Sequence, residues 1–184
     1  SFAPIDPASY PEDWDVLTDK LIMGTWRTDI PGVEIRPLGV VVDSGGEDGV
    51  TDKSYAWYRR LRKAGLHRTV ALTKGDSGRN LDWYVRETMV GGKQGEGDVP
   101  LFRLNPNKLK DIVSSSLKRR QPGPGYYNFP KPKGEKNPKG WLPASYFDEL
   151  TAEVRNEAGV WEQIRSRNEA LDLCAMIKAG SLIL

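Results

Sequence analysis

The sequence is poor in the residues that disulfides and soft-metal sites require. It contains one cysteine, Cys174, and one histidine, His67. A single cysteine excludes a disulfide within the chain and suits a reducing compartment. Zinc sites usually need four nitrogen or sulfur ligands, so these two residues are too few for one. A metal bound here is therefore expected to be a hard cation held by carboxylates.

Several functional motifs are also missing. The chain has no GxxxxGK[ST] phosphate loop, no GxGxxG dinucleotide fingerprint and no GxSxG nucleophile elbow. No apolar run approaches the roughly 18 residues that span a bilayer, and no basic segment followed by an apolar one opens the chain. We therefore expect neither a membrane span nor secretion. The first residue is Ser1 and the first methionine is Met23, so the chain is expected to be a fragment.

The charges that are present are unevenly distributed. The 184 residues suit one domain with a proper core, and their formal net charge is only +2. Residues 1–52 hold three basic and eleven acidic side chains, whereas residues 53–143 hold twenty basic and seven acidic ones. This asymmetry predicts a surface for a polyanion in the middle of the chain. A solvated lysine-rich face explains the charge equally well.

The first half of the chain has the pattern of a parallel strand, helix, strand unit. A β-branched strand is expected at 38–42 and a second strand at 68–73. Between them, Thr51 or Asp52 is expected to cap an amphipathic helix that Gly65 ends. Before this unit, the capping-box spacing of Ser9 and Glu12 predicts a helix over 9–22. The fold class is therefore α/β, with a sheet flanked by helices.

The second half is less regular. Strands are expected within 80–90 and 99–106, a helix from Asn107, a short helix within 142–150 and two strands that turn at 157–159. Residues 118–140 are rich in Pro, Gly and Lys, which predicts a basic loop with at most a short strand at 126–129. The last helix is expected to begin with a capping box, Ser166 with Glu169, and to end at Gly180.

Two acidic features are candidates for chemistry. Asp43 follows the strand in "GVVVDSGG", and ligands of open α/β sheets bind beyond the carboxyl ends of strands. A turn or cap role also explains it. Glu169 and Asp172 project from one face of the last helix, three residues apart. The capping box accounts for Glu169. Asp172 is expected at the boundary between the core-facing and the solvent-facing sides of the last helix.

The segments "GVVVDSGG", "TKG", "YYNFP", "YFDELTAE" and "RNEALD" occur in this order between Ile35 and Ala179. In order and spacing the chain resembles the large terminase subunits of lambda-type tailed phages, in their C-terminal, GpA-like nuclease domain. The resemblance implies an RNase H-like fold, with a mixed sheet flanked by helices. It also implies a single nuclease-type domain over 1–184, N-terminally truncated, that cuts concatemeric double-stranded DNA with two Mg²⁺ or Mn²⁺ ions.

The resemblance also assigns residues. Asp43 and Asp172 match metal ligands, and Glu169 occupies a position that can supply a third catalytic residue. Lys74 matches the basic residue of the strand-end "KG". The family's first strand carries another acidic ligand, and no strand ending in a free Asp precedes Leu38. That strand and its ligand are expected to be missing, which should weaken metal binding and activity.

The basic centre is expected to contact DNA phosphates. The preferred candidates are Lys118, Arg119, Arg120, Lys131 and Lys133, and the helix over 53–63 competes with them. Expected partners are double-stranded DNA, the terminase ATPase domain, the small subunit and the procapsid portal, but no membrane. The expected location is the cytoplasm of the infected bacterial host cell. A catalytically incomplete DNA-binding module, or a docking module for procapsid or small subunit, remains the alternative.

Overall fold

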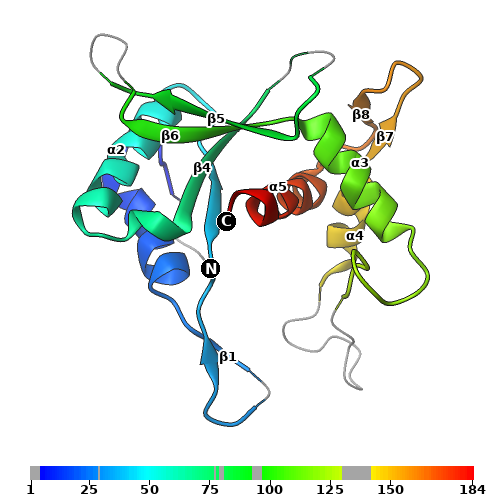
Figure 1. The fold of residues 1–184 in the computed structure, drawn as a ribbon, viewed down its shortest axis with the longest axis horizontal. Coiled ribbons are helices and arrows are strands. Elements are labelled where there is room, and N and C mark those ends of the chain that lie inside the picture. Colours follow the sequence, from blue (N-terminus) through cyan, green and yellow to red (C-terminus); the bar gives the residue numbers. More distant parts are fainter. Residues whose placement is uncertain (1–4, 29, 77, 79–80, 93–96, 130–141) are drawn as a thin grey trace. The chain divides into compact units, whose positions relative to one another are not determined.

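The computed structural model describes residues 5–184 except 29, 77, 79–80, 93–96 and 130–141. The chain divides into two compact units. The first unit comprises Ser1–Leu104 together with Gly180–Leu184, and the second comprises Asn105–Ala179. Figure 1 shows the elements in sequence colours. Whether both units act as one nuclease-type domain stays a prediction.

The first unit is built on a four-stranded mixed sheet (Figure 1). Its strands lie in the order β3 (Val40–Asp43), β4 (Val70–Gly75), β6 (Val99–Leu104) and β5 (Val85–Val90). Strands β3, β4 and β6 are parallel, whereas β5 pairs antiparallel to β6. Helix α2 (Val50–Lys63) makes the crossover from β3 to β4. The predicted strand, helix, strand unit and the α/β class are therefore confirmed.

Glycine, rather than a polar cap, starts helix α2. Gly49 is the N-cap residue with a φ of 92°, and no side chain caps the helix. The prediction that Thr51 or Asp52 caps it is wrong, because the left-handed backbone at Gly49 turns the chain into the helix two residues before Thr51. The predicted stop at Gly65 is confirmed, since its φ of 74° ends the helical conformation.

The N-terminal helix is a chain of three short pieces. It consists of η1 (Pro11–Trp14), α1 (Asp15–Leu17) and η2 (Thr18–Ile22). The predicted capping box of Ser9 and Glu12 does not form, because Tyr10 is the residue before η1 and no side chain caps that element. The Ser9 amide instead donates to Asp6 Oδ1 at 3.1 Å. A small antiparallel hairpin, β1 (Trp26–Arg27) with β2 (Glu34–Ile35), follows.

One face of the sheet forms the main core with α2 and the N-terminal helix. Its buried residues are Trp14, Val40, Trp57, Tyr58, Leu61, Val70, Leu72, Val99 and Leu101. The indole of Trp57 is fully buried and donates to Thr18 Oγ1 at 2.9 Å. Because side chains alternate along a strand, Val41 and Asp43 belong to the opposite face.

The end of α5 (Glu169–Ile183) packs on that opposite face of β3. A Cβ on Gly180 would lie 2.7 Å from Val41 Cγ2, and a Cβ on Gly39 would overlap the Leu184 side chain. Gly180 was expected to end the helix, but the helix continues to Ile183. The glycine is required by this close approach, so its position reflects packing rather than a stop.

Replacing Gly180 with leucine should lower the stability of the protein. Leucine is a good helix former, so the loss would come from its first side-chain carbon meeting Val41. Forcing extra carbon into a packed site typically costs about 1–3 kcal/mol. Urea denaturation measures this change. Unchanged stability in Gly180→Leu would contradict the packing described for the end of α5.

The second unit contains helices around a small core. Its elements are α3 (Pro106–Leu117), α4 (Ala144–Leu150), the hairpin of β7 (Glu153–Arg155) and β8 (Trp161–Gln163), and α5 as far as Ala179. Asn105 caps α3 by accepting from the Lys108 amide at 3.2 Å. The predicted α4 and the β7–β8 hairpin are confirmed, whereas residues 126–129 form no strand. The core consists of Val113, Leu150, Ala170, Leu171 and Cys174.

The start of α5 differs from the prediction. The helix begins at Glu169, and the carbonyl of Asn168 accepts from the amides of Leu171 and Asp172 at 3.0 and 3.2 Å. Asn168 therefore occupies the position before the helix, which was assigned to Ser166. The capping box of Ser166 with Glu169 is wrong because the helix starts two residues later than that spacing requires.

Candidate functional site

Asp43 is the last residue of β3 and is exposed. Its Oδ1 accepts from the Gly45 amide at 2.8 Å, which closes a turn at the strand end. No hydrogen bond to Oδ2 is formed by any residue that the structure describes. The turn role is thus confirmed, and it leaves one carboxylate oxygen available to a ligand.

The segment after Asp43 is held firmly to the next strand. Ser44 is fully buried, and its amide and hydroxyl both donate to the Thr73 carbonyl, at 2.8 and 2.9 Å. The Thr51 hydroxyl in turn donates to the Ser44 carbonyl at 2.8 Å. These bonds fix the backbone that carries Asp43.

A second carboxylate at the same end of the sheet escaped the sequence analysis. Asp76 follows β4, the neighbouring parallel strand, and its amide donates to the Leu104 carbonyl at 2.8 Å. Its Oδ1 accepts from the Gly78 amide at 2.9 Å, in a turn like that of Asp43. The signal in the sequence was an aspartate directly after the strand-end "TKG".

In the second unit Asp172 belongs to a charged network around Lys110. The Lys110 ammonium lies 2.6 and 2.7 Å from the two oxygens of Glu153, and 2.7 Å from Asp172 Oδ1. The Asn168 amide donates to Asp172 Oδ2 at 3.0 Å and also to Glu153. These residues come from α3, β7 and α5, so the fold brings together three distant segments.

The charged groups of this network are largely buried, which costs desolvation energy. Lys110 and Glu153 are 7% and 8% exposed, whereas the Asp172 side chain is 48% exposed. A buried charge is costly unless it is paired, and here the ammonium contacts three carboxylate oxygens. Asp172 is therefore a carboxylate with one oxygen held by a buried cation and an outer side that solvent reaches.

Glu169 lies outside this network. It is the exposed first residue of α5, and Arg167 Nε donates to its Oε2 at 3.3 Å. Its own backbone N–H, with Arg167 in addition, holds the pKa of its carboxyl below the usual value. Glu169 is therefore an ionised residue at a helix start, where negative charge is favourable.

The donor atoms suit a hard divalent cation. Asp43 and Asp172 offer carboxylate oxygens, which Mg²⁺ and Mn²⁺ prefer. Among the residues that the structure describes, no three His, Cys, Asp or Glu side chains are grouped as a metal site. The two aspartates belong to different units, and each is placed within its own. The chemistry of the donors thus fits the metal, and further ligands would be needed.

The basic candidates differ in their surroundings. Lys74 is half-buried in β4, and Lys118, Arg119 and Arg120 are exposed at the end of α3. Arg119 donates to the Pro124 carbonyl at 3.0 Å. Lys131 and Lys133 lie outside the described residues.

Lys118 borders a pocket of the second unit. The pocket has a volume of about 510 Å³ and is lined by Asp111, Ser114, Ser115, Lys118, Glu153, Val154, Arg155 and Trp161. Asp111 is paired with Arg155 at 3.0 Å and accepts from the Trp161 indole at 2.9 Å. The pocket therefore combines hydroxyls, an aromatic ring and cations.

The three arginines of the competing helix are committed to carboxylates. Arg59 and Arg62 of α2 both bind Asp98, at 2.7 and 3.3 Å, and Arg60 binds Asp15 at 2.8 Å. The hydrogen bond from Arg59 lowers the pKa of Asp98 to about 2. These contacts tie α2 to its surroundings, which reduces the charge it can offer to a polyanion.

Within the described residues, no helix is long and apolar enough to cross a membrane. A family model, described as terminase large subunit gpA, endonuclease domain, matches residues 3–184 of the chain. No curated protein and no solved structure matches it.

Proposed function

The chain belongs to the endonuclease domain family of the terminase large subunit gpA, and we propose that it is a Mg²⁺- or Mn²⁺-dependent endonuclease. Membership implies cleavage of DNA during packaging, and concatemeric double-stranded DNA is the proposed substrate. The observation that carries the metal dependence is Asp43, a carboxylate with one available oxygen on a rigid turn at the carboxyl end of a parallel strand. Such a strand end is where α/β sheets place their ligands.

The proposed roles follow from the contacts of each carboxylate. Asp43 and Asp172 would hold the metal ions, and Glu169 would supply a third acidic group. Divalent ions held by these residues would supply an activated water and charge stabilisation for the leaving oxygen. Gly45 orients Asp43 through its amide, and Lys110 orients Asp172 by fixing its Oδ1. Outer contacts of this kind set the direction in which a carboxylate faces a ligand: Asp43 keeps Oδ2 available, whereas Asp172 Oδ2 also accepts from the Asn168 amide.

An RNase H-like arrangement is proposed for the whole domain. Strand β3 pairs only with β4 among the residues that the structure describes, so its other edge is free to pair. A preceding strand with a further acidic ligand could join this edge. The position of Asp43 on the adjacent strand supports this proposal, because the two strand ends would lie together.

The experiment that tests this function is plasmid cleavage. Supercoiled plasmid DNA should be nicked and linearised when Mn²⁺ is present, and EDTA should stop the reaction. A chain that binds DNA but never cuts it with either metal would instead be the catalytically incomplete binding module. A docking module for procapsid or small subunit would neither bind nor cut DNA.

We expect the exposed cations at the end of α3 to contact DNA phosphates. The commitment of the α2 arginines to carboxylates favours Lys118, Arg119 and Arg120 over that helix, and Lys131 and Lys133 are proposed with them. Replacing Lys118, Arg119 and Arg120 by alanine should lower the slope of log affinity against log salt by about 0.9 for each lost contact. Fluorescence anisotropy with duplex DNA measures this slope. An unchanged slope would remove these three residues from the interface.

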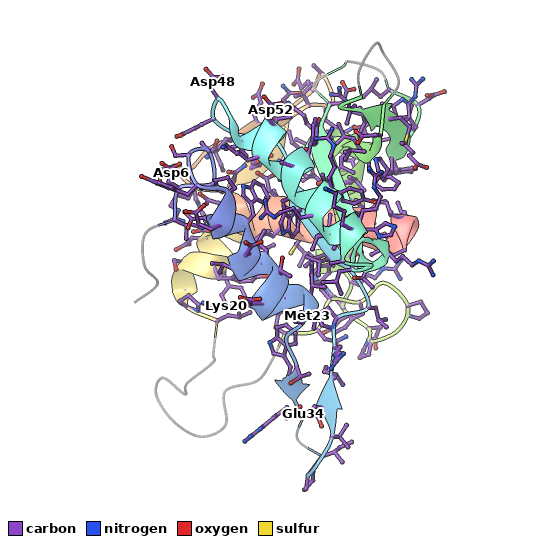
Figure 2. All side chains as sticks on the ribbon, turned by 90° about the vertical axis from the view of Figure 1, so that its left-hand side faces the viewer. Asp6, Lys20, Met23, Glu34, Asp48 and Asp52 are labelled. Carbon is purple, nitrogen blue, oxygen red and sulfur yellow. The ribbon has the colours of Figure 1, made fainter. Side chains whose placement is uncertain are left out.

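The remaining partners and the location are also proposals. In packaging, such a domain would work with the terminase ATPase domain, the small subunit and the procapsid portal, in the cytoplasm of the infected bacterium. Figure 2 shows Asp48 and Asp52 at one end of α2 and Asp6 on the neighbouring loop. These exposed carboxylates form an acidic end of the first unit, which suits it to a positively charged surface of a protein partner.

A further inference from the structure

A row of three cations crosses the sheet of the first unit. Lys74 of β4 lies opposite Arg103 of β6, and Arg103 lies opposite Arg86 of β5. Residues opposite one another in a sheet project from the same face, so all three side chains share one face. The row is defined here as the cation row: Lys74, Arg103 and Arg86. Figure 1 shows the three strands side by side.

The cation row begins where the apolar core ends. Two positions earlier on β4 and β6 are Leu72 and Leu101, which lie opposite each other and are fully buried against α2. Lys74 and Arg103 are half-buried, whereas Arg86 on the edge strand is exposed. The aliphatic stems therefore continue the packed face, and the charged ends lie at its border.

The cation row is unfavourable for folding by itself. Like charges directly opposite each other across strands destabilise a sheet. In the described part of the chain none of the three forms an ion pair with a carboxylate. Tyr55 of α2 lies beside the row: burial raises the pKa of its phenol, Arg103 opposes this shift and Asp52 adds to it. Asp52 thus lies near Tyr55, and in the described part of the chain no ion pair joins it to the row.

We propose that the cation row is a binding site for the phosphodiester backbone of duplex DNA. The proposal rests on the proposed function and extends the DNA-contacting surface to Arg86 and Arg103. Neighbouring strands are about 4.8 Å apart, so the row spans roughly 10 Å. Phosphates of one DNA strand follow one another about every 3.4 Å along the helix axis, so the row can meet two or three of them.

A bound DNA backbone would relieve the electrostatic repulsion between the three cations of the row. Each phosphate places a negative charge between cations that otherwise repel one another, and guanidinium groups bind phosphate with two parallel hydrogen bonds. No base edge needs to be read, which suits contact with any sequence. The row also lies at the carboxyl end of β4, the strand next to the one that ends in Asp43, and Asp43 projects from the opposite face of the sheet.

The test combines stability with DNA affinity. Lys74→Gln, Arg86→Gln, Arg103→Gln and the triple variant are compared with the intact chain in EDTA, so that cleavage cannot contribute. Each single change should lower the salt slope for a short duplex by about 1, and the triple change by about 3. The melting temperature should stay the same or rise, because like-charge repulsion is relieved. A residue kept only for structure would instead lower it.

Two controls complete the design. Arg68→Gln removes an exposed cation just before β4, at its other end, and should leave affinity and slope unchanged. Arg103→Lys keeps the charge and should retain the slope. Wild-type affinity and slope in the triple variant would overturn this inference while the proposed function stands. Failure of the intact chain to bind duplex DNA at all would overturn both.

Discussion

Replacing Asp43 with asparagine should reduce plasmid cleavage by at least about a hundred-fold. A catalytic metal is worth several kcal/mol, and each 1.36 kcal/mol is a factor of ten in rate. Asparagine keeps an oxygen that can accept from the Gly45 amide, so the turn after β3 should persist. The variant therefore removes the negative charge and little else. The rate is measured with Mn²⁺ at saturating DNA.

Asp48→Asn is the matched control for this change. Asp48 is an exposed aspartate in the loop before α2, at the acidic end of the first unit (Figure 2). It should cleave like the unchanged chain, because it takes no part in the proposed metal site. Asp172→Asn should repeat the loss seen with Asp43→Asn. Equal cleavage by Asp43→Asn and the intact chain would refute the role proposed for this carboxylate.

Replacing Lys110 with methionine should lower the free energy of unfolding by about 3–5 kcal/mol. Removing one partner of a buried ion pair leaves the other charge without compensation. Here Glu153 would keep its negative charge in a site that is 8% exposed. Methionine has a similar length, so the loss would come from the charge rather than from a cavity. Urea denaturation followed by circular dichroism measures this difference.

The double variant Lys110→Met and Glu153→Met separates charge from packing. Replacing a whole buried pair by apolar residues is often neutral or stabilising. The double variant should therefore recover most of the stability that Lys110→Met loses. Arg165→Met, which removes the exposed partner of Asp148, should change stability by about 1 kcal/mol or less. A double variant as unstable as Lys110→Met would show that the ion pair is not the cause.

The core of the first unit was predictable because its signals are local. The β-branched run that ends at Asp43 and the apolar face of α2 each fit within one element, so periodicity alone identifies them. The helix starts were not predictable in the same way. Gly49 begins α2 through a left-handed backbone, and Asn168 rather than Ser166 precedes α5. In each case a polar residue at capping spacing was available but another backbone geometry prevailed.

The Lys110 network could not be read from the sequence. Its members are separated by 43 positions between Lys110 and Glu153, and only tertiary folding brings them together. A lysine beside the apolar positions Leu109 and Val113 normally points to solvent. The cation row could not be predicted from the sequence for another reason. Strand register decides which residues lie opposite each other, and register is set by the sheet as a whole.

The order of the two units along the chain affects how this protein folds while it is being synthesised. The second unit is inserted into the first, because the chain leaves the first unit after Leu104 and returns at Gly180. Gly180 and Leu184 pack on β3, yet they are made only after the whole of the second unit. A nascent chain on the ribosome therefore carries β3 with this face uncovered until synthesis passes Leu184. Chaperone binding to stalled chains should decline only once Gly180–Leu184 emerge.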